Sequence, residues 1–251
     1  MKQSKIEWTE ATWNPSVGCN KISTGCKHCY AEVMARRLQA MRTPGYEKGF
    51  EFTILPDRLE MPFSIKKPTK FFVNSMSDLF HEKMPFEYLD KVFETIKQTP
   101  RHHYQILTKR ANILAEYFKD RQVPDNVWLG VTVESVEVKN RMDILRNIPA
   151  KIRFISMEPL VSDLGELDLR DIHWVIVGGE SGNQARPMDE NWAVNIKKQC
   201  IEQNVAFFFK QWGTWGADKI KRNKKVNGKE LNGKVWQSYP GVIEKQFELV
   251  L

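Results

Sequence analysis

Short apolar runs recur along the chain, and each of them ends in polar or small residues. The six clear runs cover residues 71–78, 103–110, 126–135, 151–160, 173–182 and 205–213. Continuous apolar runs of this length are typical of strands buried on both faces of a parallel sheet. Two weaker runs, at residues 11–17 and 50–56, bring the number of predicted strands to eight.

Stretches with apolar residues at helical spacing separate these strands. They cover residues 30–41, 86–99, 111–120, 136–148 and 189–204. Pro100 ends the second helix, and Asp189 is a good N-cap for the last one. Strands that alternate with helices predict parallel βαβ units. Eight such units predict an α/β fold, either a (β/α)8 TIM-type barrel or a partial barrel of that kind.

This alternation stops after Gly213. Residues 214–234 are rich in Lys, Asn and Gly and include the basic run 219-KIKRNKK-225. Two Asn-Gly pairs follow within residues 226–236, and such pairs are typical of hairpin turns. We therefore expect a barrel over residues 1–213 and a basic, hairpin-bearing extension over residues 214–251 that packs on the barrel.

Composition indicates a globular protein and restricts its compartment. Hydrophobic residues make up 41% of the 251 positions, and 38 Lys and Arg against 31 Asp and Glu give a net charge of +7. No apolar run approaches the ~20 residues that cross a bilayer, and the first ten residues do not form a secretory signal. We expect a cytoplasmic protein without a membrane partner, in which the four cysteines are reduced.

Three of the four cysteines are clustered in the segment 18-GCNKISTGCKHCY-30, with the spacing Cys-x6-Cys-x2-Cys. Thiolates of Cys19, Cys26 and Cys29 could hold three irons of a [4Fe–4S] cluster and leave the fourth iron open to a substrate. They could also bind zinc, with His28 as a further ligand, or be ordinary packed thiols. Cys200 lies within a predicted helix and is expected to be a core residue.

Polar side chains follow nearly every predicted strand. In a parallel barrel, the carboxyl ends of the strands carry the chemistry. The residues at these ends are Asn74, Ser75, Ser77, Asp78, Thr108, Lys109, Arg110, Thr132, Glu134, Ser156, Glu158, Glu180, Ser181, Arg186, Lys210 and Gln211. Their charges could instead satisfy one another as structural ion pairs.

Six segments resemble a known family: residues 12–32, 74–82, 153–160, 174–182, 185–188 and 208–213. They resemble the phage-associated three-Cys-motif family, a phage protein of unknown function that is similar to the radical S-adenosylmethionine (SAM) superfamily. The resemblance implies a radical SAM barrel with a [4Fe–4S] cluster on Cys19, Cys26 and Cys29 and with S-adenosyl-L-methionine as cofactor. One-electron reduction would give a 5′-deoxyadenosyl radical that abstracts hydrogen from a substrate.

The match to the superfamily pattern is incomplete. The first two cysteines are six residues apart instead of three, and 178-GGE-180 follows a late strand instead of the second one. Roles at the barrel mouth are therefore assigned by position. The predicted cofactor-binding residues are Ser75, Asp78, Thr108, Lys109, Thr132 and Glu134. The predicted substrate-facing, catalytic residues are Glu180, Arg186, Lys210 and Gln211.

The predicted function is that of a radical SAM enzyme that modifies or repairs a nucleic-acid base or nucleotide in DNA or RNA. The net charge, the basic run and the phage resemblance favour this substrate, although the basic run could also be a solvated loop. The implied partner is a one-electron reductant of the flavodoxin or ferredoxin type. If the protein is phage-encoded, it would act in the host cytoplasm. The alternative is a zinc-binding, nucleic-acid-interacting protein without radical chemistry.

Overall fold

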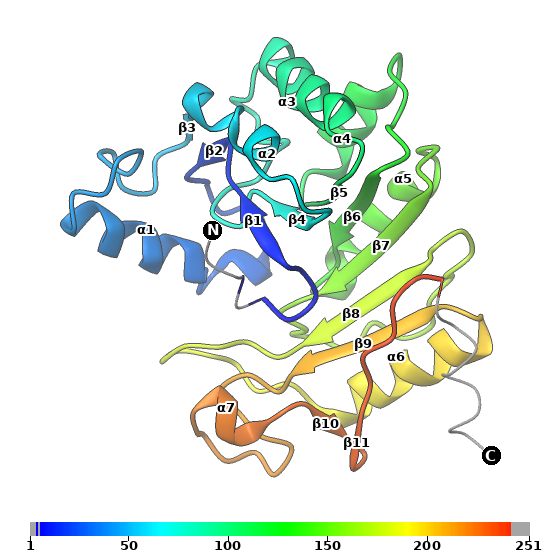
Figure 1. Cartoon of the computed structure of the whole chain (residues 1–251). Coiled ribbons are helices and arrows are strands. Elements are labelled where there is room, and N and C mark those ends of the chain that lie inside the picture. Colours follow the sequence, from blue (N-terminus) through cyan, green and yellow to red (C-terminus); the bar gives the residue numbers. More distant parts are fainter. Residues whose placement is uncertain (1–3, 5, 242–251) are drawn as a thin grey trace. The chain divides into compact units, whose positions relative to one another are not determined.

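The computed structural model describes Ser4 and residues 6–241 (Figure 1). The chain divides into two compact units. The first unit comprises residues 1–22, 29–131 and 147–151, and the second comprises residues 23–28, 132–146 and 152–251. The cysteine segment is thus shared, because Cys19 and Cys29 belong to the first unit and Cys26 belongs to the second.

The first unit is built on short parallel strands that alternate with helices. Its strands are β1 (Ala11–Trp13), β4 (Lys70–Val73), β5 (His103–Thr108) and β6 (Val127–Thr132), and its helices are α1 (Tyr30–Ala40), α2 (Met61–Ser64), α3 (Phe86–Gln98) and α4 (Ala111–Phe118). Neighbouring strands in this order pair in parallel. Helix α3 buries Leu89, Val92 and Ile96, the spacing from which the helix was predicted.

The second unit repeats the same pattern. Its strands β7 (Ile152–Met157), β8 (Trp174–Gly178) and β9 (Ala206–Gln211) pair in parallel, and its helices are α5 (Arg141–Arg146), α6 (Glu190–Glu202) and α7 (Lys224–Asn227). All five residues of β8 are buried, as expected for a central parallel strand. Asp189 caps α6 by accepting a hydrogen bond from the Asn191 amide, which confirms the predicted cap.

Among the residues that the structure describes, the strand order in the parallel sheet is β1-β4-β5-β6-β7-β8-β9, which makes seven strands instead of the predicted eight. The strand predicted at residues 50–56 is the one missing from this sheet, and the strand predicted at residues 11–17 is shorter than expected. The run at residues 11–17 is broken at Asn14 and Pro15 and gives β1 and a separate strand β2 (Ser16–Val17). The run at residues 50–56 gives only β3 (Thr53–Ile54), which pairs antiparallel with β2 outside the parallel sheet.

The predicted helix at residues 136–148 is also interrupted. It forms a 3₁₀ turn at Val136–Val138 and then α5. The break places Arg141 at the start of α5, where its guanidinium donates to the Thr132 carbonyl oxygen at 2.8 Å. A buried arginine needs such acceptors, so satisfying Arg141 takes precedence over helical regularity here.

The segment after Gly213 contains the predicted hairpin. Strands β10 (Glu230–Leu231) and β11 (Lys234–Val235) pair antiparallel around an Asn-Gly turn. The Phe209 amide donates to the Trp236 carbonyl at 2.7 Å, and the Trp212 indole donates to the Glu230 carbonyl at 2.8 Å. These bonds attach the hairpin to the end of β9. In the described part of the chain, no helix is long and apolar enough to span a membrane.

Candidate functional site

The cysteine segment carries three accessible thiols. Cys19, Cys26 and Cys29 are half-buried and Cys200 is fully buried, and none of the four forms a disulfide. Burial raises the pKa of the Cys200 thiol well above its usual range, which agrees with a packing role. Cys26 ends the 3₁₀ turn Thr24–Cys26, and Cys29 is the N-cap residue of α1.

Arg110 contacts Cys19 in the first unit. Its side chain is only 5% exposed, and Nη1 donates to the Cys19 sulfur at 3.5 Å and to Asp78 Oδ2 at 3.0 Å. Asp78 also accepts from Thr108 Oγ1 at 2.6 Å and from the Lys109 amide at 3.1 Å. Three of the predicted cofactor-binding residues therefore form one network that ends at a cysteine sulfur.

Arg110 also donates to the carboxylate of Glu82 and to the side-chain oxygen of Asn20. Nε donates to Glu82 Oε2 at 2.8 Å, and Nη2 donates to Asn20 Oδ1. Burial alone would lower the pKa of Arg110, but the negative charges of Asp78 and Cys19 raise it above its ordinary value. The guanidinium therefore carries a permanent positive charge against the Cys19 sulfur.

Glu134 fixes the Cys26 side of the segment in the second unit. It is fully buried, and Oε1 accepts from the Ser23 hydroxyl and from the Gly25 amide, the latter at 3.2 Å. Oε2 pairs with Arg141 Nη1 at 3.0 Å. A Cβ at position 25 would lie 2.7 Å from Glu134 Cγ, so only glycine allows this approach.

Glu180 and Arg186 form a second contact with the same segment. Arg186 grips both carboxylate oxygens of Glu180, at 2.8 and 2.7 Å, and Nη2 also donates to the Thr24 carbonyl at 3.0 Å. Burial would raise the pKa of Glu180, but its bonds to Arg186 outweigh that effect and lower it. The bidentate geometry makes the pair rigid, so it holds the backbone of the 3₁₀ turn in place.

The other predicted residues have different partners. Lys210 pairs with Glu158 at 3.0 Å, and Gln211 donates to the Ser181 hydroxyl at 3.1 Å. Ser75 donates to Asn14 Oδ1 at 3.2 Å.

Thr132 is buried, and it offers its carbonyl to Arg141. Neither Lys210 nor Gln211 joins the groups around Cys19 or the 3₁₀ turn through a described hydrogen bond.

The prediction from sequence did not assign roles to three residues that the structure places at the centre of these networks: Arg110, Arg141 and Glu82. Arg110 directly follows Thr108 and Lys109 at the end of β5, so its position at a strand end was a usable signal. Arg141 lies within a predicted helix, where only tertiary contacts reveal its role.

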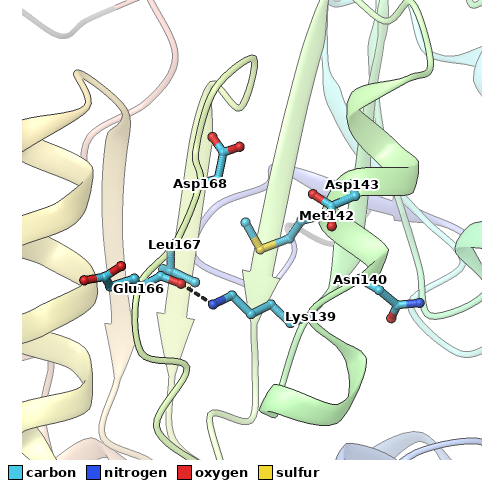
Figure 2. Close-up of a pocket in the computed structure, with 7 residues that line it drawn as sticks. All are labelled: Lys139, Asn140, Met142, Asp143, Glu166, Leu167 and Asp168. Atoms are coloured by element: carbon cyan, nitrogen blue, oxygen red, sulfur yellow. Dashed lines mark hydrogen bonds between the residues drawn. The ribbon is translucent and has the colours of Figure 1, made fainter.

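A separate cavity of about 540 Å³ lies in the second unit (Figure 2). Its lining residues are Lys139, Asn140, Met142, Asp143, Glu166, Leu167 and Asp168. Lys139 donates to the carbonyl oxygens of Leu164 and Glu166, which anchors the loop before β8. None of these residues was predicted to be functional, and the amine of Lys139 is committed to backbone acceptors.

The donor chemistry of the cysteine segment suits an iron–sulfur cluster. None of the three thiols is in a disulfide or fully buried, and Cys19 already accepts a charged hydrogen bond of the kind that stabilises a thiolate. Among the described residues, however, no group of three or more His, Cys, Asp or Glu side chains is assembled as a metal site.

The chain belongs to the family described as "Protein of unknown function (DUF5131)", whose model matches residues 3–240. No curated protein matches it. A solved spore photoproduct lyase with one cysteine replaced by serine is similar, with a TM-score of 0.50 and 16% identity over 71% of this chain and 58% of the other. This likeness shows the fold and confirms the predicted partial-barrel class.

Two further structures of spore photoproduct lyase also match. One is complexed with dinucleoside spore photoproduct, with a TM-score of 0.46 and 12% identity over 79% of this chain and 62% of the other. The other, a double mutant with bound AdoMet and dinucleoside spore photoproduct, has a TM-score of 0.45 and 14% identity over 79% and 63%. The chain therefore spans less than two thirds of the length of these solved structures.

Proposed function

We propose that this protein is a radical SAM enzyme in which Cys19, Cys26 and Cys29 hold a [4Fe–4S] cluster. The observation that carries the proposal is the set of three accessible thiols, none of them in a disulfide, on one short segment of a chain that resembles the radical SAM superfamily and shares its fold with spore photoproduct lyase. When bound, such a cluster supplies one electron that cleaves S-adenosyl-L-methionine to a hydrogen-abstracting 5′-deoxyadenosyl radical.

The residues of the chain position the thiols for this task. Arg110 places a fixed positive charge beside the Cys19 sulfur, which favours the thiolate that an iron ligand requires. Glu134 and Arg186 hold the backbone of residues 23–25, immediately before Cys26. In this proposal Glu134, Glu180 and Arg186 are positioning residues for the cysteine segment, which replaces the roles assigned to them from sequence alone.

The remaining predicted residues keep their proposed roles. Ser75, Asp78, Thr108, Lys109 and Thr132 stay candidates for the cofactor side of the site. Lys210 and Gln211 stay candidates for the substrate side. Asp78 acts indirectly in this scheme, because its oxygens are taken up by Thr108, Lys109 and Arg110.

A nucleic-acid base or nucleotide is the proposed substrate. The net charge of +7 and the basic run at residues 219–225 support it, because cations that contact phosphates supply sequence-independent affinity. Lys221, Lys224 and Lys225 are exposed in this run.

Anaerobic reconstitution with iron and sulfide tests the proposal. The expected product is a brown protein with about four irons per chain that releases 5′-deoxyadenosine from S-adenosyl-L-methionine on reduction with dithionite. Cys26→Ala should lose both properties, and Cys200→Ala should keep both, because Cys200 is a buried packing residue. A Cys26→Ala protein that still cleaves the cofactor would refute the proposal. A colourless protein with one bound zinc would indicate the zinc-binding alternative.

A further inference from the structure

Large apolar side chains are concentrated on the outer side of α1 and just before it. Of the nine exposed large hydrophobic residues in the described part of the chain, five lie between positions 22 and 41: Ile22, Tyr30, Val33, Met34 and Met41. The most exposed of the five is Val33, at 71%. We call Tyr30, Val33, Met34 and Met41 the α1 face.

The α1 face is not the side by which the helix joins its unit. Ala31 and Ala35 instead pack in a buried cluster with Val17, Tyr46 and Met76. An amphipathic helix normally presents polar residues opposite its buried side. Here Val33 and Met34 are exposed beside Arg36 and Arg37, and large apolar side chains that gather in the exposed part of one helix indicate an interaction site.

The α1 face begins beside a proposed cluster ligand. Cys29 is the N-cap residue of α1, and Tyr30 is the first residue of the helix. With a rise of 1.5 Å per residue, Met34 lies only about 8 Å from Cys29 along the helix axis. A protein bound to this face would therefore lie within two helical turns, along the helix axis, of a proposed ligand of the cluster.

The charge around the α1 face is positive. Arg36, Arg37 and Arg42 are exposed on or directly after the helix. The one acidic residue of the helix, Glu32, is already paired with Arg36 at 2.6 Å and with Lys21 at 2.9 Å. An apolar centre that contains Met and Tyr and is rimmed by arginine has the composition of a protein–protein interface whose partner is acidic.

We propose that the α1 face is the docking surface for an acidic one-electron carrier protein. This inference rests on the proposed function, because it assigns the electron source for the same cluster. The carrier is oxidised by one electron and the cluster is reduced by one, and no bond forms or breaks. The methionines adapt their shape to the carrier, and the arginines steer it to the surface.

Two other occupants fit the surface less well. A nucleic acid would be held chiefly by phosphate contacts and would leave four large apolar side chains in contact with a charged backbone. A second copy of this chain, paired about a two-fold axis, would bring the two arginine rims together with like charge. An acidic protein satisfies both the apolar centre and the basic rim.

A single substitution tests the surface. Val33→Glu places a negative charge at the most exposed residue of the α1 face. Val226→Glu is the matched control, because Val226 is 72% exposed, lies in the short helix α7 and receives the same charge. The reconstituted proteins are reduced anaerobically by photoreduced flavodoxin, by photoreduced ferredoxin or by dithionite, and the loss of visible cluster absorbance is followed with time.

We expect Val33→Glu to raise the carrier concentration needed for half-maximal reduction rate by about tenfold, as for a central interface residue. Val226→Glu should match the wild type, and dithionite should reduce all three proteins equally. Arg37→Glu should weaken the carrier interaction in the same direction and make it less sensitive to salt. Binding of oxidised flavodoxin, followed by its own NMR shifts, should show the same order of affinities.

The outcomes separate the two proposals. If dithionite does not reduce a cluster in the wild-type protein, the proposed function fails. If dithionite reduces it but neither carrier does, or if Val33→Glu and wild type are reduced equally by carrier, the docking surface is overturned. If Val33→Glu instead weakens DNA binding, or abolishes a dimer seen by analytical ultracentrifugation, the surface belongs to nucleic acid or to a second copy and the proposal is wrong.

Discussion

The isosteric change Glu134→Gln should strongly destabilise the protein, because it removes one charge from a buried ion pair. Glu134 is 0% exposed and Arg141 is 9% exposed, with 3.0 Å between Oε2 and Nη1. Glutamine can still present an oxygen to Ser23 and Gly25, but its NH₂ group then faces the Arg141 guanidinium, so two donors meet. The arginine is left buried without its counter-charge.

Breaking a buried pair by removing one partner costs about 3–5 kcal/mol of unfolding free energy. In a chain of this size, that loss corresponds to a fall in Tm of about 6–20 °C. Urea denaturation followed by circular dichroism measures the first quantity, and thermal unfolding measures the second. Removing the arginine as well, in Glu134→Gln with Arg141→Leu, should recover part of the loss, because no buried charge then lacks a partner.

Glu137→Gln is the matched control for this experiment. Glu137 is exposed, lies three residues further along the chain and undergoes the same substitution. Its effect should stay within about 0.5 kcal/mol, as for ordinary surface changes. If Glu134→Gln proves as stable as Glu137→Gln, the argument that this ion pair anchors the cysteine segment is wrong.

Three further predictions concern the backbone, pH and the thiols. Gly18→Ala should destabilise the protein far more than Gly165→Ala does. Both glycines have positive φ, but a Cβ at position 18 would lie 2.1 Å from the Glu51 carbonyl oxygen, whereas a Cβ at position 165 would have nothing within 4 Å. Equal urea midpoints for the two variants would contradict this prediction. Burial lowers the pKa values of His102 and His173 in the folded protein, so the unfolded state binds more protons than the folded state. The free energy of unfolding should therefore fall as the pH drops below about 6.5. A free energy of unfolding that does not change with pH in this range would contradict the prediction. Iodoacetamide should alkylate three thiols in the native apoprotein and should alkylate Cys200 only after denaturation. Mass spectrometry identifies the labelled residues. Rapid labelling of Cys200 in the native protein would show that this thiol is not buried.

Most of the fold could be predicted from the sequence, because hydrophobic periodicity reports local burial. Strands β4 to β9 coincide with the six clear apolar runs, apart from Lys70 at the start of β4, and Asp189 marks the start of α6. Short elements were harder to place. A two-residue strand such as β3 has no period to detect, and its antiparallel pairing with β2 depends on residues far away in the chain.

The chemistry of the cysteine segment was likewise visible in the sequence, since three thiols within eleven residues are local information. The side chains that hold that segment in place could not be identified from the sequence. The contacts of Arg110 with Cys19, of Glu134 with Gly25 and of Arg186 with Thr24 span 91, 109 and 162 positions.

By itself, the sequence determined which elements form and which side chains carry ligand chemistry, because both follow from neighbouring residues. Only the tertiary structure decided which of the charged residues at the strand ends hold the cysteine segment and which side of α1 remains exposed. Those outcomes depend on which distant groups meet in a buried environment, where each charge needs a partner.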